Sequence, residues 1–306
     1  MEIRKLSAGH GVRWFRQAID LGTRNPKAVF GAALLLILTL YAAALLVMLP
    51  AMGALQGAGT KPAAANILAM LGWLAPVFLV VLMLMPILFG GLMHVIREAE
   101  AGRPIGATAL YSPFRQGKAR TLAALGLVQL VFGVASALVV AALAGANYWH
   151  DYLGAMQAAM SGLVPAVPQP EHPGLLVVFQ LVFNYFSYAI TLFSVPLILF
   201  SGQPLLQAIK FSAVAAVRNV STNLVASALF LASILVAALI VMLLAGFASL
   251  LGSFVHTLVG ELLAFVVFMG FGVIVIVVLT GGAYFAWRDT FGGQALIEPP
   301  FLGVEA

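Results

Sequence analysis

Five polar side chains recur at helical spacing within the apolar stretch 175–200. They are separated by four, three, four and three residues: Gln180, Asn184, Ser187, Thr191 and Ser194. At about 100° per residue they share an arc of about 80° on one helix face. Amide and hydroxyl groups in an apolar environment require hydrogen-bond partners. This polar stripe therefore predicts either the lining of a substrate or water path or hydrogen bonding between helices.

Hydrogen bonding between helices is the interpretation that we favour for the polar stripe. It needs only a polar neighbour, and each such bond contributes about 0.6 kcal/mol on average. Gln129 in the third apolar stretch and Asn223 at the start of the fifth are the expected partners.

A second group of candidate residues lies in the basic segment that precedes the first apolar stretch. Val12, Phe15 and Ile19 share one helical face, and basic residues occupy another. A basic amphipathic helix beside a spanning helix is typical of a segment in the lipid headgroup plane. Each cation there attracts anionic lipid by about 1 kcal/mol, and a Trp ring anchors at the interface. The residues predicted to contact headgroups are Arg13, Trp14, Arg16 and Arg24. The alternative is a plain membrane anchor whose charges set the topology.

Motifs for other chemistry do not occur. The chain has no cysteine, which excludes a disulfide, a thiol nucleophile and a Cys-based zinc site. It also has no Walker loop, dinucleotide fingerprint, His-Glu-x-x-His motif or Ser-His-Asp order. We therefore expect no catalytic residues, no metal and no cofactor, and a protein that is not an enzyme.

Six apolar stretches are long enough to cross a membrane and to position these residues. The 306-residue chain is 63% hydrophobic and only 8% charged, whereas soluble domains carry about a quarter charged residues. A spanning helix needs about 20 apolar residues. The stretches are 28–49, 67–95, 122–146, 175–200, 224–251 and 262–287. The sequence predicts an all-α integral membrane bundle of six transmembrane helices.

The distribution of basic residues predicts an orientation. All of the 15 Lys and Arg residues except Lys61 lie in segments on one side of the predicted membrane. Because Lys and Arg are retained on the cytoplasmic side, both termini are expected in the cytoplasm. The net charge of +5 reflects this retention, and no basic groove indicates nucleic-acid binding.

The sequence also predicts a threefold repeat within a single polytopic domain, 1–306. Gln-Ala-Ile at 17–19 precedes Arg24-Asn25, and the same letters at 207–209 precede Arg218-Asn219. Residues 105–118 lead into the third apolar stretch in the same way. We expect three helical hairpins, each preceded by a cytoplasmic amphipathic helix. The repeats are 1–99, 100–203 and 204–292, followed by a short tail, 293–306.

Two terminal segments resemble a known family. Ala8-Gly9-His10-Gly11, Trp14 and Arg24-Asn25-Pro26 are similar to the N-terminal signature of an uncharacterised family of proteobacterial polytopic inner-membrane proteins. Residues 284–292, Tyr-Phe-Ala-Trp-Arg-Asp-Thr-Phe-Gly, resemble its C-terminal signature. The layout resembles, more loosely, the membrane domain attached to some glycerophosphodiester phosphodiesterases, but the chain has no βα alternation for their catalytic barrel. The resemblance implies the inner membrane of a Gram-negative bacterium.

These observations support two hypotheses about function. The first is a non-enzymatic inner-membrane protein that organises the envelope or its lipids, or that supports a membrane protein partner. The alternative is a permease or facilitator for a small or lipid-like molecule. Membrane lipids are the expected partners, together with an unidentified membrane protein.

Overall fold

The computed structural model describes residues 2–23, 25–57 and 67–292, and every regular element within these ranges is a helix. The predicted tail 293–306, Arg24 and Lys61 lie outside the described residues. The elements are α1 (Gly9–Asp20), η1 (Leu21–Thr23), α2 (Pro26–Gly57), α3 (Ile67–Glu100), η2 (Ala107–Tyr111), α4 (Ser112–Arg115), α5 (Ala119–Ala144), α6 (Tyr148–Met160), α7 (Pro173–Leu199), α8 (Leu205–Arg218), α9 (Val220–Ser253) and α10 (Thr257–Phe291).

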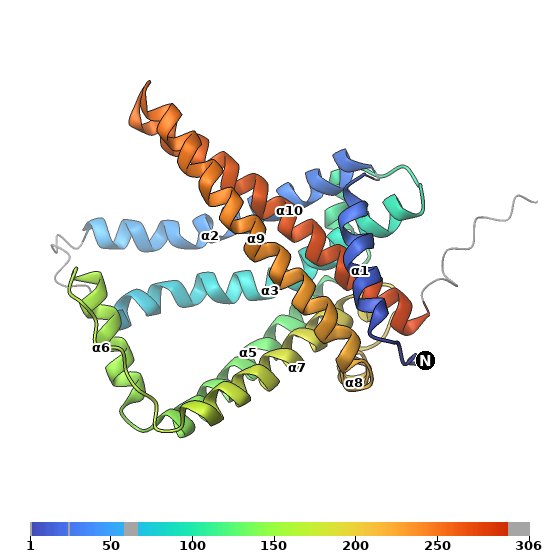
Figure 1. Cartoon of the computed structure of the whole chain (residues 1–306), viewed down its shortest axis with the longest axis horizontal. Coiled ribbons are helices and arrows are strands. Elements are labelled where there is room, and N and C mark those ends of the chain that lie inside the picture. Colours follow the sequence, from blue (N-terminus) through green and yellow to red (C-terminus); the bar gives the residue numbers. More distant parts are fainter. Residues whose placement is uncertain (1, 24, 58–66, 293–306) are drawn as a thin grey trace, which may run out of the picture.

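Six of these helices are long and apolar enough to span a membrane: α2, α3, α5, α7, α9 and α10. They pair as three hairpins, α2 with α3, α5 with α7 and α9 with α10. The predicted all-α fold with six candidate spans is thereby confirmed. Figure 1 shows the three hairpins diverging from the end of the molecule where α1 and α8 lie.

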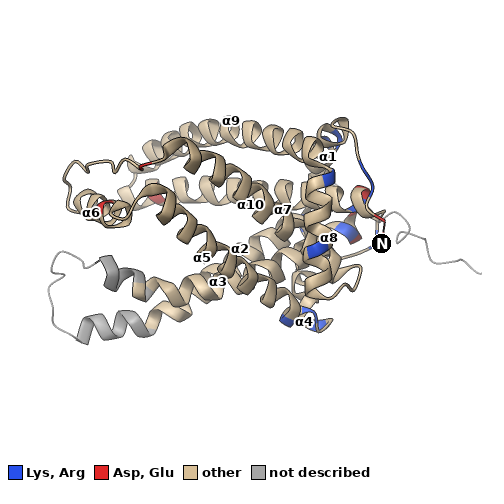
Figure 2. Ribbon diagram, turned by 90° about the horizontal axis from the view of Figure 1, so that it is seen from below, with Lys and Arg blue, Asp and Glu red and all other residues tan. Residues whose placement is uncertain are grey.

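Positive charge is concentrated at the end from which the hairpins diverge. Figure 2 shows Lys and Arg residues around α1, α4 and α8, whereas α6 lies at the other end. We call these two ends the basic end and the opposite end.

The hydrophobic core lies in the half of the molecule nearest the basic end. The buried apolar residues of the spans gather in the segments 28–36, 87–99, 122–125, 189–199 and 283–291. Toward the opposite end the spans expose large apolar side chains, for example Leu46, Leu138, Leu181 and Leu243. Exposed leucines at these positions are expected where lipid is the solvent.

Three short elements lie at the basic end, α1, η2 and α8. Each packs on a different hairpin from the one that follows it in the chain. Helix α1 contacts α9 and α10, η2 contacts α2 and α3, and α8 contacts α7. A close approach fixes two of these contacts: a Cβ atom at Gly11 of α1 would lie 2.6 Å from the Thr222 carbonyl oxygen, and one at Gly91 of α3 would overlap the Leu110 carbonyl of η2. The three elements therefore connect the hairpins in a closed ring, in which the N-terminal helix covers the last hairpin.

The second of the three predicted amphipathic helices takes a different form. Residues 107–115 make a 3-10 turn, η2, followed by the single-turn helix α4. Pro104 lies just before η2, and Pro113 lies in the first turn of α4. Because proline lacks an amide hydrogen and restricts the preceding residue, these positions interrupt a longer helix.

The segment before α1 is held by the start of α9. Asn219 is fully buried, accepts a hydrogen bond from the Leu6 amide at 2.8 Å and donates one to the Arg4 carbonyl at 3.1 Å. The Thr222 hydroxyl donates to the Leu6 carbonyl at 3.1 Å. The Arg4 amide in turn donates to the Thr290 carbonyl at the end of α10. One side chain thus recognises the backbone of a segment more than 200 residues away along the chain.

Asn25, its counterpart in the predicted repeat, makes a similar contact at the start of α2. Its side-chain amide donates to the Ile105 carbonyl at 3.4 Å, in the segment before η2. Both asparagines therefore contact the backbone that leads into the next packing element of the ring.

The long connection between α5 and α7 contains a further helix, α6, which lies outside the six predicted apolar stretches. Residues 148–160 contain no proline, whereas the run from Pro165 to Pro173 does not form a helix until its last residue starts α7. Three aromatic rings pack together in the first turns of α6: Tyr148, Trp149 and Tyr152.

Candidate functional site

The half of the polar stripe nearest the basic end lies between helices. Ser194 is fully buried, and its hydroxyl lies 2.9 Å from that of Ser212 in α8. Thr191 accepts a hydrogen bond from the Gln129 amide of α5 at 2.8 Å and donates to the Ser187 carbonyl at 2.9 Å. These contacts join α7 to two neighbouring helices.

Toward the opposite end, the side chains of the stripe are less buried. Asn184 is exposed, and the partner of its side-chain amide is the Gln180 oxygen one turn away, at 3.5 Å. Asn223, the second expected partner of the stripe, donates instead to the Tyr185 hydroxyl at 3.1 Å. Of the five predicted residues, Thr191 and Ser194 therefore make contacts between helices, whereas the side chains of Gln180 and Ser187 are half-buried and that of Asn184 is exposed.

The basic residues predicted to contact lipid headgroups are separated by the structure. Arg13 and Arg16 are exposed on α1, as that prediction requires. The expectation that Trp14 anchors at the interface is wrong, because its side chain is only 1% exposed and its indole N–H donates to Asp289 at 2.9 Å. Trp14 lies on the face of α1 that packs on α9 and α10. Arg24, the fourth predicted residue, lies outside the described residues.

A buried ionic cluster that was not expected from the sequence joins α1, α3 and α10 at the basic end. The Arg288 side chain of α10 is 6% exposed and pairs with Glu100 at the end of α3, whose side chain is 12% exposed. The Arg288 guanidinium also donates to Asp289 at 3.1 Å and, more weakly, to Gln17 of α1 at 3.4 Å. It lies over the Phe285 ring, 4.9 Å from the centroid.

The signal that would have revealed this cluster is the presence of charge at the ends of apolar helices. Glu100 and Arg288 lie 188 residues apart, so only the packing of α3 on α10 brings them together. A buried charge is stable only when paired. Once these two helix ends are buried, Glu100 and Arg288 are therefore expected to pair with each other.

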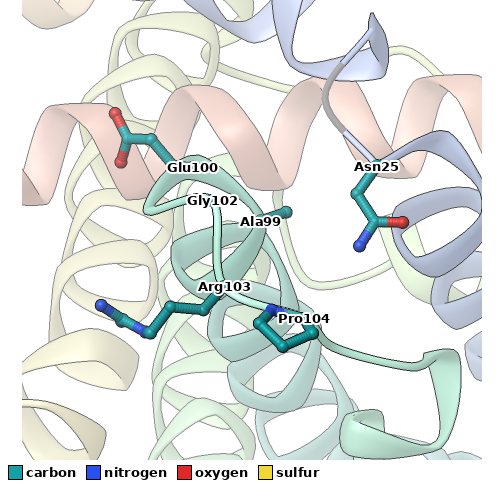
Figure 3. Close-up of a pocket in the computed structure, with 6 residues that line it drawn as sticks. All are labelled: Asn25, Ala99, Glu100, Gly102, Arg103 and Pro104. Atoms are coloured by element: carbon teal, nitrogen blue, oxygen red, sulfur yellow. The ribbon is translucent and has the colours of Figure 1, made fainter.

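A shallow hollow of about 550 Å³ lies beside the cluster, between the start of α2 and the segment after α3. Figure 3 shows the side chains of Glu100 and Arg103 pointing away from Asn25 across the hollow. The Arg103 guanidinium pairs with Glu98, and this hydrogen bond raises the pKa of Arg103 above its ordinary value. The polar side chains that line the hollow do not point toward a common position, so its geometry does not indicate a ligand.

The arrangement provides exposed cations and structural ion pairs rather than reactive groups. Among the described residues, no three His, Asp or Glu side chains lie close enough to hold a metal ion. No protein-family model, curated protein or solved structure matches this chain. The family resemblance of the terminal segments therefore stays a prediction.

Proposed function

We propose that this polytopic membrane protein is a non-enzymatic protein that binds and organises anionic lipids through its basic end. The observation that carries the proposal is the exposed face of α1, where Arg13 and Arg16 lie beside exposed Val12 and Ile19. Adjacent apolar and basic faces are the pattern of a helix in the headgroup plane. An anionic headgroup can contact the guanidinium groups while its chains cover the apolar side chains.

The packing of α1 supports this proposal because it holds the exposed face in place. Its opposite face is buried, with Gly11, Trp14 and Ala18 packed on the last hairpin. A fixed helix loses little conformational freedom when a lipid binds, so more of the electrostatic attraction contributes to affinity.

We also propose that the protein lies in the inner membrane of a Gram-negative bacterium, with both termini in the cytoplasm. The clustering of Lys and Arg at the basic end supports this orientation, because such residues are retained on the cytoplasmic side. Anionic lipids of the cytoplasmic leaflet would then lie beside α1.

The alternative function is a permease or facilitator for a small or lipid-like molecule, with the polar stripe as its lining. Ser194 and Thr191 make contacts between helices, which leaves Gln180, Asn184 and Ser187 for such a path. Because part of the polar stripe is used for packing between helices, the structure supports lipid binding better than transport.

The test is a measurement of lipid retention by native mass spectrometry in nanodiscs of equal phosphatidylglycerol and phosphatidylcholine. Two arginines at about 1 kcal/mol each correspond to a roughly 30-fold weaker affinity for phosphatidylglycerol in the Arg13→Gln/Arg16→Gln variant. The matched control is Arg13→Lys/Arg16→Lys, which keeps the charge and is expected to retain phosphatidylglycerol. Equal retention by the Gln variant and the wild type would overturn the proposal, and solute flux into liposomes would favour the permease.

A further inference from the structure

Helix α8 turns its small side chains toward the protein and its large apolar side chains outward. The fully buried residues of α8, on the side that packs on α7, are Ala208, Ser212, Ala215 and Ala216. The opposite side, which we call the outer face of α8, comprises Leu206, Lys210, Val214 and Val217. Leu206 and Val217 are 79% and 61% exposed.

Hydrogen bonds to α7 fix which face of α8 points outward. The Ser212 hydroxyl lies 2.9 Å from the Ser194 hydroxyl of α7. The Tyr185 hydroxyl, also in α7, donates to the Ala216 carbonyl at 2.7 Å. A rotation of α8 that buried Leu206 would break both contacts and leave their polar groups without partners. The outward position of the large apolar side chains is therefore part of the packed structure.

This arrangement is the reverse of the one in a surface helix of a soluble protein, which turns its apolar residues toward the core. In membranes, small residues such as Ala and Ser lie between helices, and large apolar side chains contact lipid. Figure 2 shows α8 running across the direction of the spans at the basic end. A helix with this direction and an apolar exposed face is typical of the membrane interface.

Two features of the outer face point to a phospholipid as its partner. The exposed apolar surface continues into the next span, because Val220 and Leu224 at the start of α9 are also exposed. Lys210 lies one turn after Leu206 and one turn before Val214, so its side chain rises from within the apolar surface. A lysine in such a position extends its stem along apolar groups while its ammonium group reaches a polar headgroup.

We propose that the outer face of α8 inserts into the lipid leaflet at the basic end, with its apolar side chains among the acyl chains and Lys210 on a lipid phosphate. The inference rests on the proposed function in placing the membrane surface at this end, but it uses neither Arg13 nor Arg16. Helix α1 packs on the last hairpin and α8 on α7, so the two lipid contacts lie on different hairpins.

The position of Val217 relative to the membrane can be measured with a nitroxide label, because the chain has no cysteine of its own. The label is attached to Val217→Cys in the full chain, in liposomes of equal phosphatidylglycerol and phosphatidylcholine. Its collisions with oxygen, which concentrates in hydrocarbon, are compared with its collisions with a water-soluble nickel chelate. Oxygen is expected to dominate, as it should at Leu235→Cys, an exposed position in the middle of α9.

The matched control is Glu2→Cys, an exposed position before α1 at which the nickel chelate is expected to dominate. Leu206→Cys is the second test position on α8 and should give the same result as Val217→Cys. Labels on α8 that collide mainly with the nickel chelate would face water, and labels that collide with neither reagent would be covered by protein. Either result would overturn the proposal.

The phosphate contact is tested by Lys210→Gln, with Lys210→Arg as the variant that keeps the charge. Loss of one cation at the surface corresponds to about a fivefold weaker affinity for phosphatidylglycerol, measured by native mass spectrometry in nanodiscs. Lys210→Arg is expected to retain the lipid, and unchanged retention by Lys210→Gln would overturn the phosphate contact.

The label at Val217 also separates this inference from the proposed function. In the Arg13→Gln/Arg16→Gln variant the label is expected to stay in hydrocarbon, because α8 is held by α7 and not by α1. A label in water, together with weaker phosphatidylglycerol retention in that variant, would refute the α8 contact and leave the α1 contact standing. A label in hydrocarbon with unchanged retention would refute the α1 contact and support insertion of α8.

Discussion

Replacing Glu100 with glutamine tests whether the buried ionic cluster holds α3 and α10 together. In the wild type, Glu100 compensates the Arg288 guanidinium, of which only 6% of the side chain is exposed. Glu100→Gln keeps the shape of the side chain and removes its charge, so Arg288 is left with Asp289 and the weaker contact to Gln17.

The expected loss follows from the degree of burial and the remaining partner. Breaking a buried ion pair by removing one partner costs about 3–5 kcal/mol. Asp289 still neutralises Arg288, which places the loss at the lower end, about 3 kcal/mol, or roughly a 150-fold change in the unfolding equilibrium. Arg288→Met alone leaves both Glu100 and Asp289 without their cation, whereas in the double variant Glu100→Gln/Arg288→Met only Asp289 is left unpaired. We therefore expect the double variant to lose less stability than the sum of the two single changes.

Reversible unfolding in mixed micelles with increasing dodecyl sulfate measures these free energies, with tryptophan fluorescence as the signal. Trp14 and Trp287 are both buried at this end of the molecule and report on its opening. Glu98→Gln is the matched control, because its partner Arg103 has a side chain that is 40% exposed and such pairs contribute at most about 1 kcal/mol. If Glu100→Gln destabilises no more than this control, or if the two single changes simply add in the double variant, the buried pair does not hold α3 and α10 together.

Two further predictions use the same unfolding measurement. Gly91→Ala is expected to destabilise by about 2 kcal/mol, because its Cβ would overlap the Leu110 carbonyl, whereas Gly133→Ala, with no atom within 4 Å, should stabilise slightly through helix propensity; equal effects at both glycines would contradict the close packing of η2 on α3. Trp14→Phe is expected to lose about 1.5–3 kcal/mol, because it leaves the Asp289 carboxylate without its indole donor. A neutral effect of Trp14→Phe would show that the hydrogen bond from the indole to Asp289 does not stabilise the protein.

The positions of the six spans were predictable because membrane insertion depends on a local property, the length of an apolar stretch. The predicted stretches 28–49 and 224–251 lie inside α2 and α9, which extend further at both ends. The ends differ because backbone hydrogen bonding continues a helix beyond its last apolar residue. Helix α6 was not predicted because a short helix outside the spans has no long apolar stretch to indicate it.

The candidate site was only partly predictable. Spacing predicted that the members of the polar stripe share one face of α7, but it could not show that Ser194 contacts α8 while Asn184 is exposed. On α1, the predicted apolar residues Val12 and Ile19 are exposed, and Trp14 is buried. A helical pattern defines faces, but it does not determine which face contacts protein and which contacts lipid when both surroundings are apolar.

The sequence by itself determined that this chain is a helical membrane protein with six candidate spans and that its positive charge lies at one end. Only the tertiary structure decided which hairpin each short element covers, and that Arg288 pairs with Glu100. The physical reason is that insertion into a membrane is governed by the composition of each segment. Pairing between segments depends on close backbone approach and on the burial of complementary polar groups, which arise only when distant helices pack together.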